Sequence, residues 1–273
     1  MTRVLVTNDD GVTSPGIAAL ARALATVGHD VVVVAPDHDA SGTGASLGRI
    51  ATDTAIAVTP SSISGFDGDV FGLAGPPAMC VVVAANGAFG EPPELVVSGI
   101  NAGLNTGRST LHSGTVGAAL AAQNFGLRGL AVSQDQPGEG HWHTAAMLAA
   151  DISVVLMDAP DLVTLSLNVP GVEAADVRST RWGGLAEFGS VRTQIVDFSD
   201  NEIHVDMLPT HYDPPEDSDL GLVRAGYAAV TSLHAGVEVW GQVRPGDAFD
   251  PGAIPGASQG DSLSAPRHVL RRA

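Results

Sequence analysis

The sequence of 273 residues contains no lysine and only one cysteine. Without lysine the chain can have neither a Schiff-base lysine nor the lysine of a phosphate-binding P-loop, so both kinds of site are excluded. The single cysteine, Cys80, excludes a disulfide within the chain and a cysteine-cluster metal site. Basic residues are few in general, and the formal net charge of -17 argues against non-specific binding to nucleic acid or anionic membranes.

The sequence also lacks a long apolar run. None of its hydrophobic segments approaches the length of a membrane span. No signal-peptide pattern is visible, since Met1-Thr2-Arg3 leads straight into an apolar segment that a core strand would use. Apolar residues nevertheless make up 44% of the sequence, which is typical of a globular protein. We therefore expect a cytoplasmic protein with no membrane contact and no nucleic-acid polymer as partner.

Short apolar strands alternate with helices through the first two thirds of the sequence. The predicted strands are rich in valine and leucine, as expected of strands buried on both faces of a parallel sheet. Strands are predicted at 3–7, 31–35, 95–98, 129–133 and 162–168, and helices at 15–27, 76–87, 114–125 and 142–157. This alternation predicts an α/β fold with a Rossmann-like, mostly parallel sheet sandwiched by helices.

Two regions depart from this alternation. Residues 49–74 carry alternating segments that suggest a hairpin-like excursion. From about residue 171 onward the pattern becomes that of a C-terminal antiparallel β extension, with antiparallel strands predicted within 176–208 and a further strand at 226–233. Between them, the Pro/Asp-rich residues 209–220 predict an exposed loop.

These patterns suggest three parts of the chain. Residues 1–170 are expected to form the α/β core, and residues 171–235 a β-rich extension that covers the site and mediates oligomerisation. Residues 236–273 are rich in glycine and proline, which predicts an extended or mobile tail.

The most informative segment is VTNDDG at 6–11, where the first predicted strand ends in two adjacent carboxylates, Asp9 and Asp10. Open α/β sheets place their ligands just past the carboxyl ends of their parallel strands. Two neighbouring carboxylates repel each other unless a positive group lies beside them, and a hard divalent cation is the simplest candidate. The alternative is an ordinary acidic turn in which Gly11 supplies a positive φ.

Three further polar segments follow predicted strands or open a helix. The first holds Ser41, the second holds Asn101 and Asn105, and the third is the Ser-Gly-Thr run at 113–115, which opens a predicted helix. Taken alone, the Ser41 loop is a plain turn and the Ser113 segment is a helix cap, although hydroxyls and free N–H groups at a helix start can also hold phosphate. Loops that follow successive parallel strands gather at one edge of the sheet. Asp9, Asp10, Ser41 and Asn101 would then supply only oxygen ligands, which favours Mg²⁺, Mn²⁺ or Ca²⁺ over zinc.

These segments resemble the SurE survival-protein phosphatases, a family of metal-dependent nucleotidases. Four stretches carry the resemblance: VTNDDG at 6–11, VVAPDHDASGTGASL at 33–47, VSGINAGLNTG at 97–107 and HSGTVGAAL at 112–120. Their order and spacing also fit the family. The resemblance covers residues 3–133 well and continues more loosely through NVP at 168–170, RW at 181–182 and GYAAVTSL at 226–233.

The resemblance implies a site, a reaction and an assembly. One divalent cation per subunit, Mg²⁺ or Mn²⁺, would be held by four residues: Asp9, Asp10, Ser41 and Asn101. Phosphate would be held by Asn8, Asn105, Ser113, Gly114 and Thr115. The implied reaction is hydrolysis of nucleoside monophosphates to nucleoside and phosphate, as in a 5′-nucleotidase, by a homodimer or homotetramer built through the C-terminal part.

Several positions depart from the family pattern. The family usually has Gly-Thr-Pro-x-Asp-Cys where this chain has Gly75-Pro76-Pro77-Ala78-Met79-Cys80, so a threonine and an aspartate are missing. A basic residue of the family is replaced by His38, an acid is missing near Arg108, and the late Thr-Pro-Leu pattern reads Thr231-Ser232-Leu233. None of these changes removes an implied metal ligand.

The resulting hypothesis is a metal-assisted phosphomonoesterase. Asp9 or Asp10 would take the proton of the attacking water, and His38 or His112 is a weaker candidate for protonating the leaving oxygen, since a lone histidine near a cleft is more often structural. One alternative is a SurE-like metal-binding protein that has weak or lost nucleotidase activity. Another is a different Rossmann-like enzyme, but no Gly-x-Gly-x-x-Gly run follows the first strand.

Overall fold

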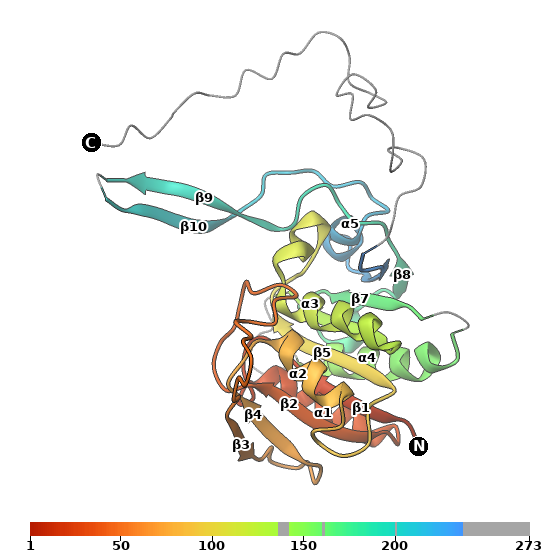
Figure 1. Cartoon of the computed structure of the whole chain (residues 1–273). Coiled ribbons are helices and arrows are strands. Elements are labelled where there is room, and N and C mark those ends of the chain that lie inside the picture. The colour runs from red at the N-terminus through yellow and green to blue at the C-terminus, as the bar shows by residue number, and fades with distance from the viewer. Residues whose placement is uncertain (136–141, 160–161, 200, 237–273) are drawn as a thin grey trace, which may run out of the picture. The chain divides into compact units, whose positions relative to one another are not determined.

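A computed structural model describes residues 1–135, 142–159, 162–199 and 201–236. Within these residues, nine strands form one main sheet in the order β3-β4-β2-β1-β5-β6-β7-β11-β8. Their bounds are β3 (Val58–Ser61), β4 (Val70–Leu73), β2 (Asp30–Pro36), β1 (Arg3–Thr7), β5 (Leu95–Ala102), β6 (Arg128–Gln134), β7 (Thr164–Val169), β11 (Ala228–Leu233) and β8 (Thr180–Trp182). The six strands from β4 to β7 in this order pair in parallel, so the α/β, mostly parallel sheet is confirmed (Figure 1).

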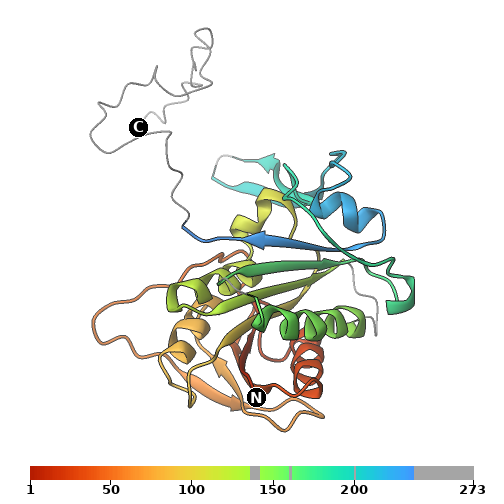
Figure 2. The same ribbon diagram turned by 90° about the vertical axis from the view of Figure 1, so that its right-hand side faces the viewer.

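Helices cover both faces of this sheet. One face carries α1 (Pro15–Thr26) and α4 (Trp142–Met157), and the other carries α2 (Pro77–Ala85) and α3 (Gly114–Ala121), as Figure 2 shows. Alternate residues of β1 pack on opposite sides: Val4 and Val6 belong to the core under α1 and α4, and Leu5 to the core under α2 and α3. The continuous apolar sequence of the central strands follows from this burial on both faces.

The predicted helices of the first two thirds are confirmed, with small shifts at their ends. The third predicted helix ends earlier than expected, because α3 stops at Ala121 and a 3-10 turn, η2 (Ala122–Phe125), follows it. Gly126 then adopts a φ of 67°, the left-handed conformation that commonly ends helices. The hairpin-like excursion within 49–74 is also confirmed, since β3 and β4 pair antiparallel and β4 joins β2.

The C-terminal part contributes a separate hairpin and two strands of the main sheet. Strands β9 (Val191–Phe198) and β10 (Ile203–Pro209) form an antiparallel two-stranded sheet, which extends beyond the main sheet in Figure 1. The predicted strand at 226–233 is β11, which pairs antiparallel with β7. The prediction of antiparallel strands was wrong for β8, which pairs in parallel with β11. A parallel pair needs a long connection, and the β9–β10 hairpin and α5 (Asp219–Arg224) lie between β8 and β11 in the chain.

The prediction of an exposed loop over 209–220 was partly wrong. Thr210, Ser218, Asp219 and Leu220 are all buried, and α5 begins at Asp219. The Ser218 side chain accepts a hydrogen bond from the N–H of Gly221, so Ser218 is an N-cap rather than a loop residue. Short 3-10 helices also occur at η1 (Gly107–His112) and η3 (Ala174–Asp176).

No helix among the described residues is long and apolar enough to span a membrane. The tail predicted over 236–273 lies outside the described residues, apart from Gly236.

Candidate metal and phosphate site

The turn after β1 is closed by its own polar side chains. The Asn8 Nδ2 group donates hydrogen bonds to the Gly11 carbonyl (3.1 Å) and to the Ser14 hydroxyl (2.7 Å). Ser14 in turn caps α1, and Gly11 has a φ of 98°, which only glycine adopts readily. These contacts fix the backbone between Asn8 and Gly11, and therefore the backbone positions from which the two carboxylates project.

Asp9 lies against the first turn of α3. Its side chain is buried, and its Oδ1 atom accepts a hydrogen bond of 2.5 Å from the Thr115 hydroxyl. Burial raises the pKa of Asp9, while Thr115 and the N–H of Gly114 oppose this shift. A Cβ atom at Gly114 would lie 2.8 Å from both Cβ and Oδ2 of Asp9, so only glycine lets the helix approach so closely. The sequence-predicted Gly114 and Thr115 are therefore direct neighbours of Asp9.

Asp10 is half-buried and bears an unpaired oxygen atom. Burial raises its pKa to about 6, with further contributions from the negative charges of Asp9 and Asp39. Its Oδ2 atom is fully buried and has no hydrogen-bond partner among the described residues. No cationic side chain of the described chain contributes to the pKa of Asp9 or Asp10. Such a pair of carboxylates fits the place of a bound cation.

The loop that follows β2 is hydrogen-bonded to the backbone of Asp9. The N–H of Ala40 donates a 2.8 Å hydrogen bond to the Asp9 carbonyl, and the N–H of Ser41 donates one of the same length to Asp39 Oδ1. The pKa of Asp39 is lowered first by the Ser41 side chain and second by this backbone hydrogen bond. The Ser41 side chain is exposed, and no hydrogen bond of the described residues joins it to the acidic pair. Further along the loop, Gly44 N–H donates to the His112 carbonyl just before α3.

Asn101 belongs to the end of β5, the strand next to β1. Thr7 pairs with Ser98 in this register, so Asn101 lies at the same edge of the sheet as the acidic pair. The Asn101 Nδ2 group donates to the Gly103 carbonyl at 2.8 Å, so its side-chain oxygen is the atom that could bind a cation. The register of β5 against β6 shifts between Ser98 and Asn101, which is typical of backbone near a functional site.

Asn105 is held by a residue for which the sequence predicted no role. The Asn105 N–H donates to Asn168 Oδ1 (2.9 Å), and Asn168 Nδ2 donates back to the Asn105 carbonyl (3.0 Å). The Asn105 side chain donates to the Ser133 hydroxyl. Asn168 lies in the NVP stretch that resembles the family, but its role depends on a contact across 63 positions of sequence, which no local pattern could indicate.

Several predicted residues have structural partners within the described chain. Ser113 caps α3 by accepting a hydrogen bond from Val116 N–H, as the plain cap interpretation predicted. His38 is exposed and its Nδ1 atom lies within hydrogen-bond distance of Asp37 Oδ1 (2.6 Å), and His112 is exposed as well. Met79 and Cys80 are buried in the core beneath α2, so the altered run from Gly75 to Cys80 builds a helix and contains none of the predicted ligands.

The donor chemistry limits which metal fits. The described residues contain no group of three or more His, Cys, Asp or Glu side chains that could hold a metal ion. A site at the acidic pair would therefore need hydroxyl or amide oxygens in addition to its carboxylates. Such oxygen-only sets are typical of hard divalent cations.

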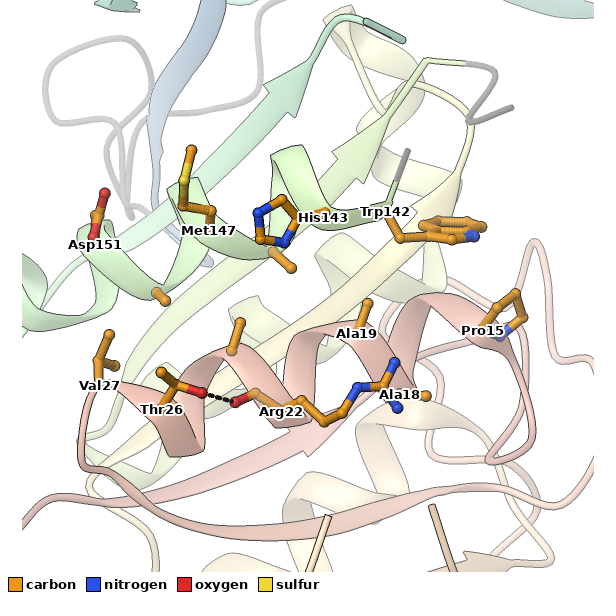
Figure 3. Close-up of a pocket in the computed structure, with 13 residues that line it drawn as sticks. Pro15, Ala18, Ala19, Arg22, Thr26, Val27, Trp142, His143, Met147 and Asp151 are labelled. Carbon is orange, nitrogen blue, oxygen red and sulfur yellow. Dashed lines mark hydrogen bonds between the residues drawn. The ribbon is translucent and has the colours of Figure 1, made fainter. Parts of the chain in front are cut away.

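A separate groove of about 620 Å³ lies between α1 and α4 (Figure 3). Five alanines line it, and Arg22, Trp142, His143, Met147 and Asp151 are among its larger side chains. None of the residues that line it is a predicted metal or phosphate ligand. Hence the groove is distinct from the acidic edge of the sheet.

The chain is similar in sequence and fold to known proteins. The family model for "Survival protein SurE" matches residues 4–189. A Yersinia enterocolitica protein named 5'/3'-nucleotidase SurE is 35% identical over 247 residues, which cover 88% of this chain and 94% of that protein. A Proteus mirabilis protein of the same name is 36% identical over 239 residues, covering 86% and 90%. Among solved structures, a SurE protein from Aquifex aeolicus matches with a TM-score of 0.71 and 29% identity, covering 85% of this chain and 93% of the other.

Proposed function

The chain belongs to the SurE family, and from this premise we propose that it is a metal-dependent phosphomonoesterase that hydrolyses nucleoside monophosphates to nucleoside and phosphate. The relatives from Yersinia enterocolitica, Proteus mirabilis and Yersinia pestis all carry the name 5'/3'-nucleotidase. The protein is accordingly a nucleotidase, a hydrolase that acts with a divalent cation on a nucleoside monophosphate.

One observation supports this function above the others. Asp10 Oδ2 is buried without a partner beside the buried Asp9, and no positive side chain of the described residues lowers the pKa of either carboxyl. A buried oxygen without a partner is costly, so its retention points to a ligand that pairs with it. A cation that also binds phosphate satisfies both carboxylates.

We assign the residue roles as follows. Asp9, Asp10, Ser41 and Asn101 would hold the cation. When bound, the cation supplies positive charge that stabilises the phosphoryl oxygens and makes a water molecule more acidic. Asp9 or Asp10 accepts the proton of the attacking water, and the Thr115 hydroxyl orients Asp9 for this role. The remaining phosphate contacts are assigned to five residues: Asn8, Asn105, Ser113, Gly114 and Thr115.

Two finer points of the reaction are part of the proposal. We propose Mg²⁺ or Mn²⁺ as the cation, because the donor set contains only oxygen atoms. We propose 5′-nucleoside monophosphates as the main substrates, while the relatives' names include 3′ activity, so both positions need to be tested.

We further propose that residues 171–235 form contacts between copies of the chain, in a homodimer or homotetramer. The β9–β10 hairpin supports this, because six large apolar side chains on it are exposed: Ile195, Val196, Phe198, Ile203, Val205 and Met207. Exposed apolar surface of this kind marks interaction sites in soluble proteins.

Phosphate release from a panel of 5′- and 3′-nucleoside monophosphates tests the function. The assay is run with Mg²⁺, with Mn²⁺ and with EDTA, and metal binding is measured on the same sample. We expect release that requires the metal and is faster for the 5′ series. Folded, metal-binding protein that releases no phosphate from any substrate would contradict the proposal and support the binding-protein alternative.

A further inference from the structure

Asp219 is a buried carboxylate outside the acidic pair. Its side chain lies at the start of α5 and is only 1% exposed. Three backbone N–H groups donate to it: Gly107 to Oδ2 at 2.8 Å, and Ala186 and Leu220 to Oδ1 at 2.9 Å and 2.7 Å. Burial raises the pKa of Asp219, and these three N–H groups oppose that shift; no cationic side chain of the described residues contributes to it.

Two of these three donors come from segments far away in the sequence. Gly107 is 112 positions from Asp219 and begins η1, and Ala186 belongs to the connection between β8 and β9. Gly107 has a φ of 61°, and a Cβ atom there would lie 2.7 Å from the backbone of Phe188. Asp219 therefore fixes the place where the chain after β5 meets the chain after β8.

The segment held in this way carries proposed phosphate ligands at both ends. Asn105 precedes Gly107 by two residues and is clamped by Asn168. Beyond Gly107, η1 runs to His112 and leads directly to Ser113, the cap of α3, whose next residues contact Asp9. A shift at Gly107 would thus move both Asn105 and the start of α3.

We propose that Asp219 is a positioning residue for phosphate binding. Through Gly107 it holds the proposed phosphate ligands in place without touching the substrate. The proposal rests on the phosphatase function and on the assignment of Asn105 and Ser113 to Thr115 as the phosphate site. It adds helix α5 to the parts of the chain on which substrate binding depends.

An almost isosteric substitution, Asp219→Asn, tests the proposal. A carboxylate offers acceptor atoms on both sides, as three N–H donors require. In Asp219→Asn one of the two oxygens becomes an NH₂ group, which cannot accept from an N–H donor. Asp217→Asn is the matched control, because Asp217 is an exposed residue two positions before Asp219 and the charge change is identical.

The experiment compares wild type, Asp219→Asn and Asp217→Asn. KM and kcat for a 5′-nucleoside monophosphate, inhibition by inorganic phosphate, Mn²⁺ affinity and deuterium uptake of peptides from 103–113 are measured. For Asp219→Asn we expect KM and the phosphate inhibition constant to rise about tenfold, the size typical of removing a supporting group. We also expect faster exchange in 103–113 and smaller changes in Mn²⁺ affinity and kcat than in KM. Asp217→Asn should match wild type in every readout.

Other outcomes separate this inference from the proposed function. If wild type and Asp217→Asn hydrolyse normally and Asp219→Asn matches them in KM, phosphate inhibition and exchange, the positioning role is wrong. If wild type shows no metal-dependent hydrolysis, the phosphatase function is wrong, and the positioning role for that reaction is overturned with it. Should Asp219→Asn fail to fold, Gly107→Ala disturbs the same contact from the other side and is expected to raise KM in the same way. An unchanged KM in folded Gly107→Ala would overturn the role.

Discussion

At the carboxyl edge of the main sheet, polar atoms are buried without partners, whereas on the β9–β10 hairpin apolar side chains are exposed to solvent. Asn8 Oδ1 and Asp10 Oδ2 are buried and lack a hydrogen bond within the described chain. On the hairpin, Phe198 is 70% exposed and Ile195 66%. Each condition costs free energy in an isolated chain, and each is relieved by a different partner: a cation and its substrate at the edge, apolar surface at the hairpin.

The two regions also differ in how firmly the described chain holds them. The edge is cross-linked by hydrogen bonds between distant segments, such as Ala40 to Asp9, Thr115 to Asp9 and Gly107 to Asp219. The hairpin is held mainly by pairing between its own two strands. An isolated two-stranded hairpin is marginally stable in water. Changes at the edge should therefore affect binding and catalysis, and changes at the hairpin should affect association.

The largest effect is expected from Asp10→Asn. The substitution removes one ligand charge, and activity should fall about a thousandfold, because a bound metal contributes several kcal/mol and each factor of ten is about 1.4 kcal/mol. The metal-free variant should be at least as stable as wild type, because repulsion between Asp9 and Asp10 is removed. Phosphate release, Mn²⁺ titration and thermal unfolding without metal measure these effects.

The control for this variant is Asp151→Asn, an exposed carboxylate on α4. It changes the net charge equally and should leave activity, metal affinity and unfolding as in wild type. Full activity in Asp10→Asn would show that Asp10 is not a ligand, and loss of folded structure would show that its role is structural.

A second, smaller effect is expected from Gly114→Ala. The added Cβ atom would lie 2.8 Å from two side-chain atoms of Asp9, so Asp9 or the start of α3 must shift. A displacement of about 1 Å near a reacting group can cost roughly a hundredfold in rate, so kcat/KM should fall by about ten- to a hundredfold. Steady-state kinetics and Mn²⁺ affinity check this, with Gly184→Ala as control because a Cβ atom there meets nothing within 4 Å. Unchanged kinetics in Gly114→Ala would mean that Asp9 can move without consequence.

These contacts mark the limit of what the sequence could predict. Strands such as β1 and β2 were predictable because burial on both faces of the sheet requires a continuous run of apolar residues. Such a run is a local feature of the sequence. The position of Asp9 and Asp10 at a strand end was predictable for the same reason. The burial of Asp219 was not, because its partners Gly107 and Ala186 lie 112 and 33 positions away and the surrounding Pro/Asp composition is typical of an exposed loop. The parallel pairing of β8 with β11 likewise depends on the path of the chain rather than on either segment.

Metal affinity and the stability of the metal-free chain should both depend on pH. In the metal-free protein, burial together with Asp9 and Asp39 raises the pKa of Asp10 to about 6. Below this pH a proton occupies the carboxyl and competes with the cation, so metal affinity should fall as pH falls through about 6 and level off above it. A raised pKa also means that the folded, metal-free chain binds the proton more tightly than the unfolded chain. Its stability should therefore fall as pH rises from about 4 to about 6.

Calorimetric titration with Mn²⁺ at several pH values measures the first part, and thermal unfolding without metal measures the second. In Asp10→Asn both pH dependences should be weaker than in wild type, since the titrating group is absent. An affinity that stays constant across the range around pH 6 would show that Asp10 is already ionised without the cation.

The smallest effect on catalysis is expected at the hairpin. Ile195 pairs across the strands with Val205, and both side chains are exposed. Ile195→Glu places a charge in the apolar surface that we propose to join copies of the chain, and should lower the molar mass in solution toward that of a monomer. Since Ile195 has little buried area to lose, the unfolding temperature of the separated chain should stay close to that of Asn201→Glu, which adds the same charge at the exposed turn.

Light scattering coupled to size-exclusion chromatography measures the mass, and phosphate release measures the remaining activity. If the hairpin only joins copies, Ile195→Glu should keep most of its activity, because the acidic edge and its hydrogen bonds lie within one chain. A large loss of activity on dissociation would instead mean that a neighbouring copy completes the site, and the contrast between the two regions would then no longer hold. A wild-type chain that is already monomeric would remove the proposed role of the exposed apolar surface.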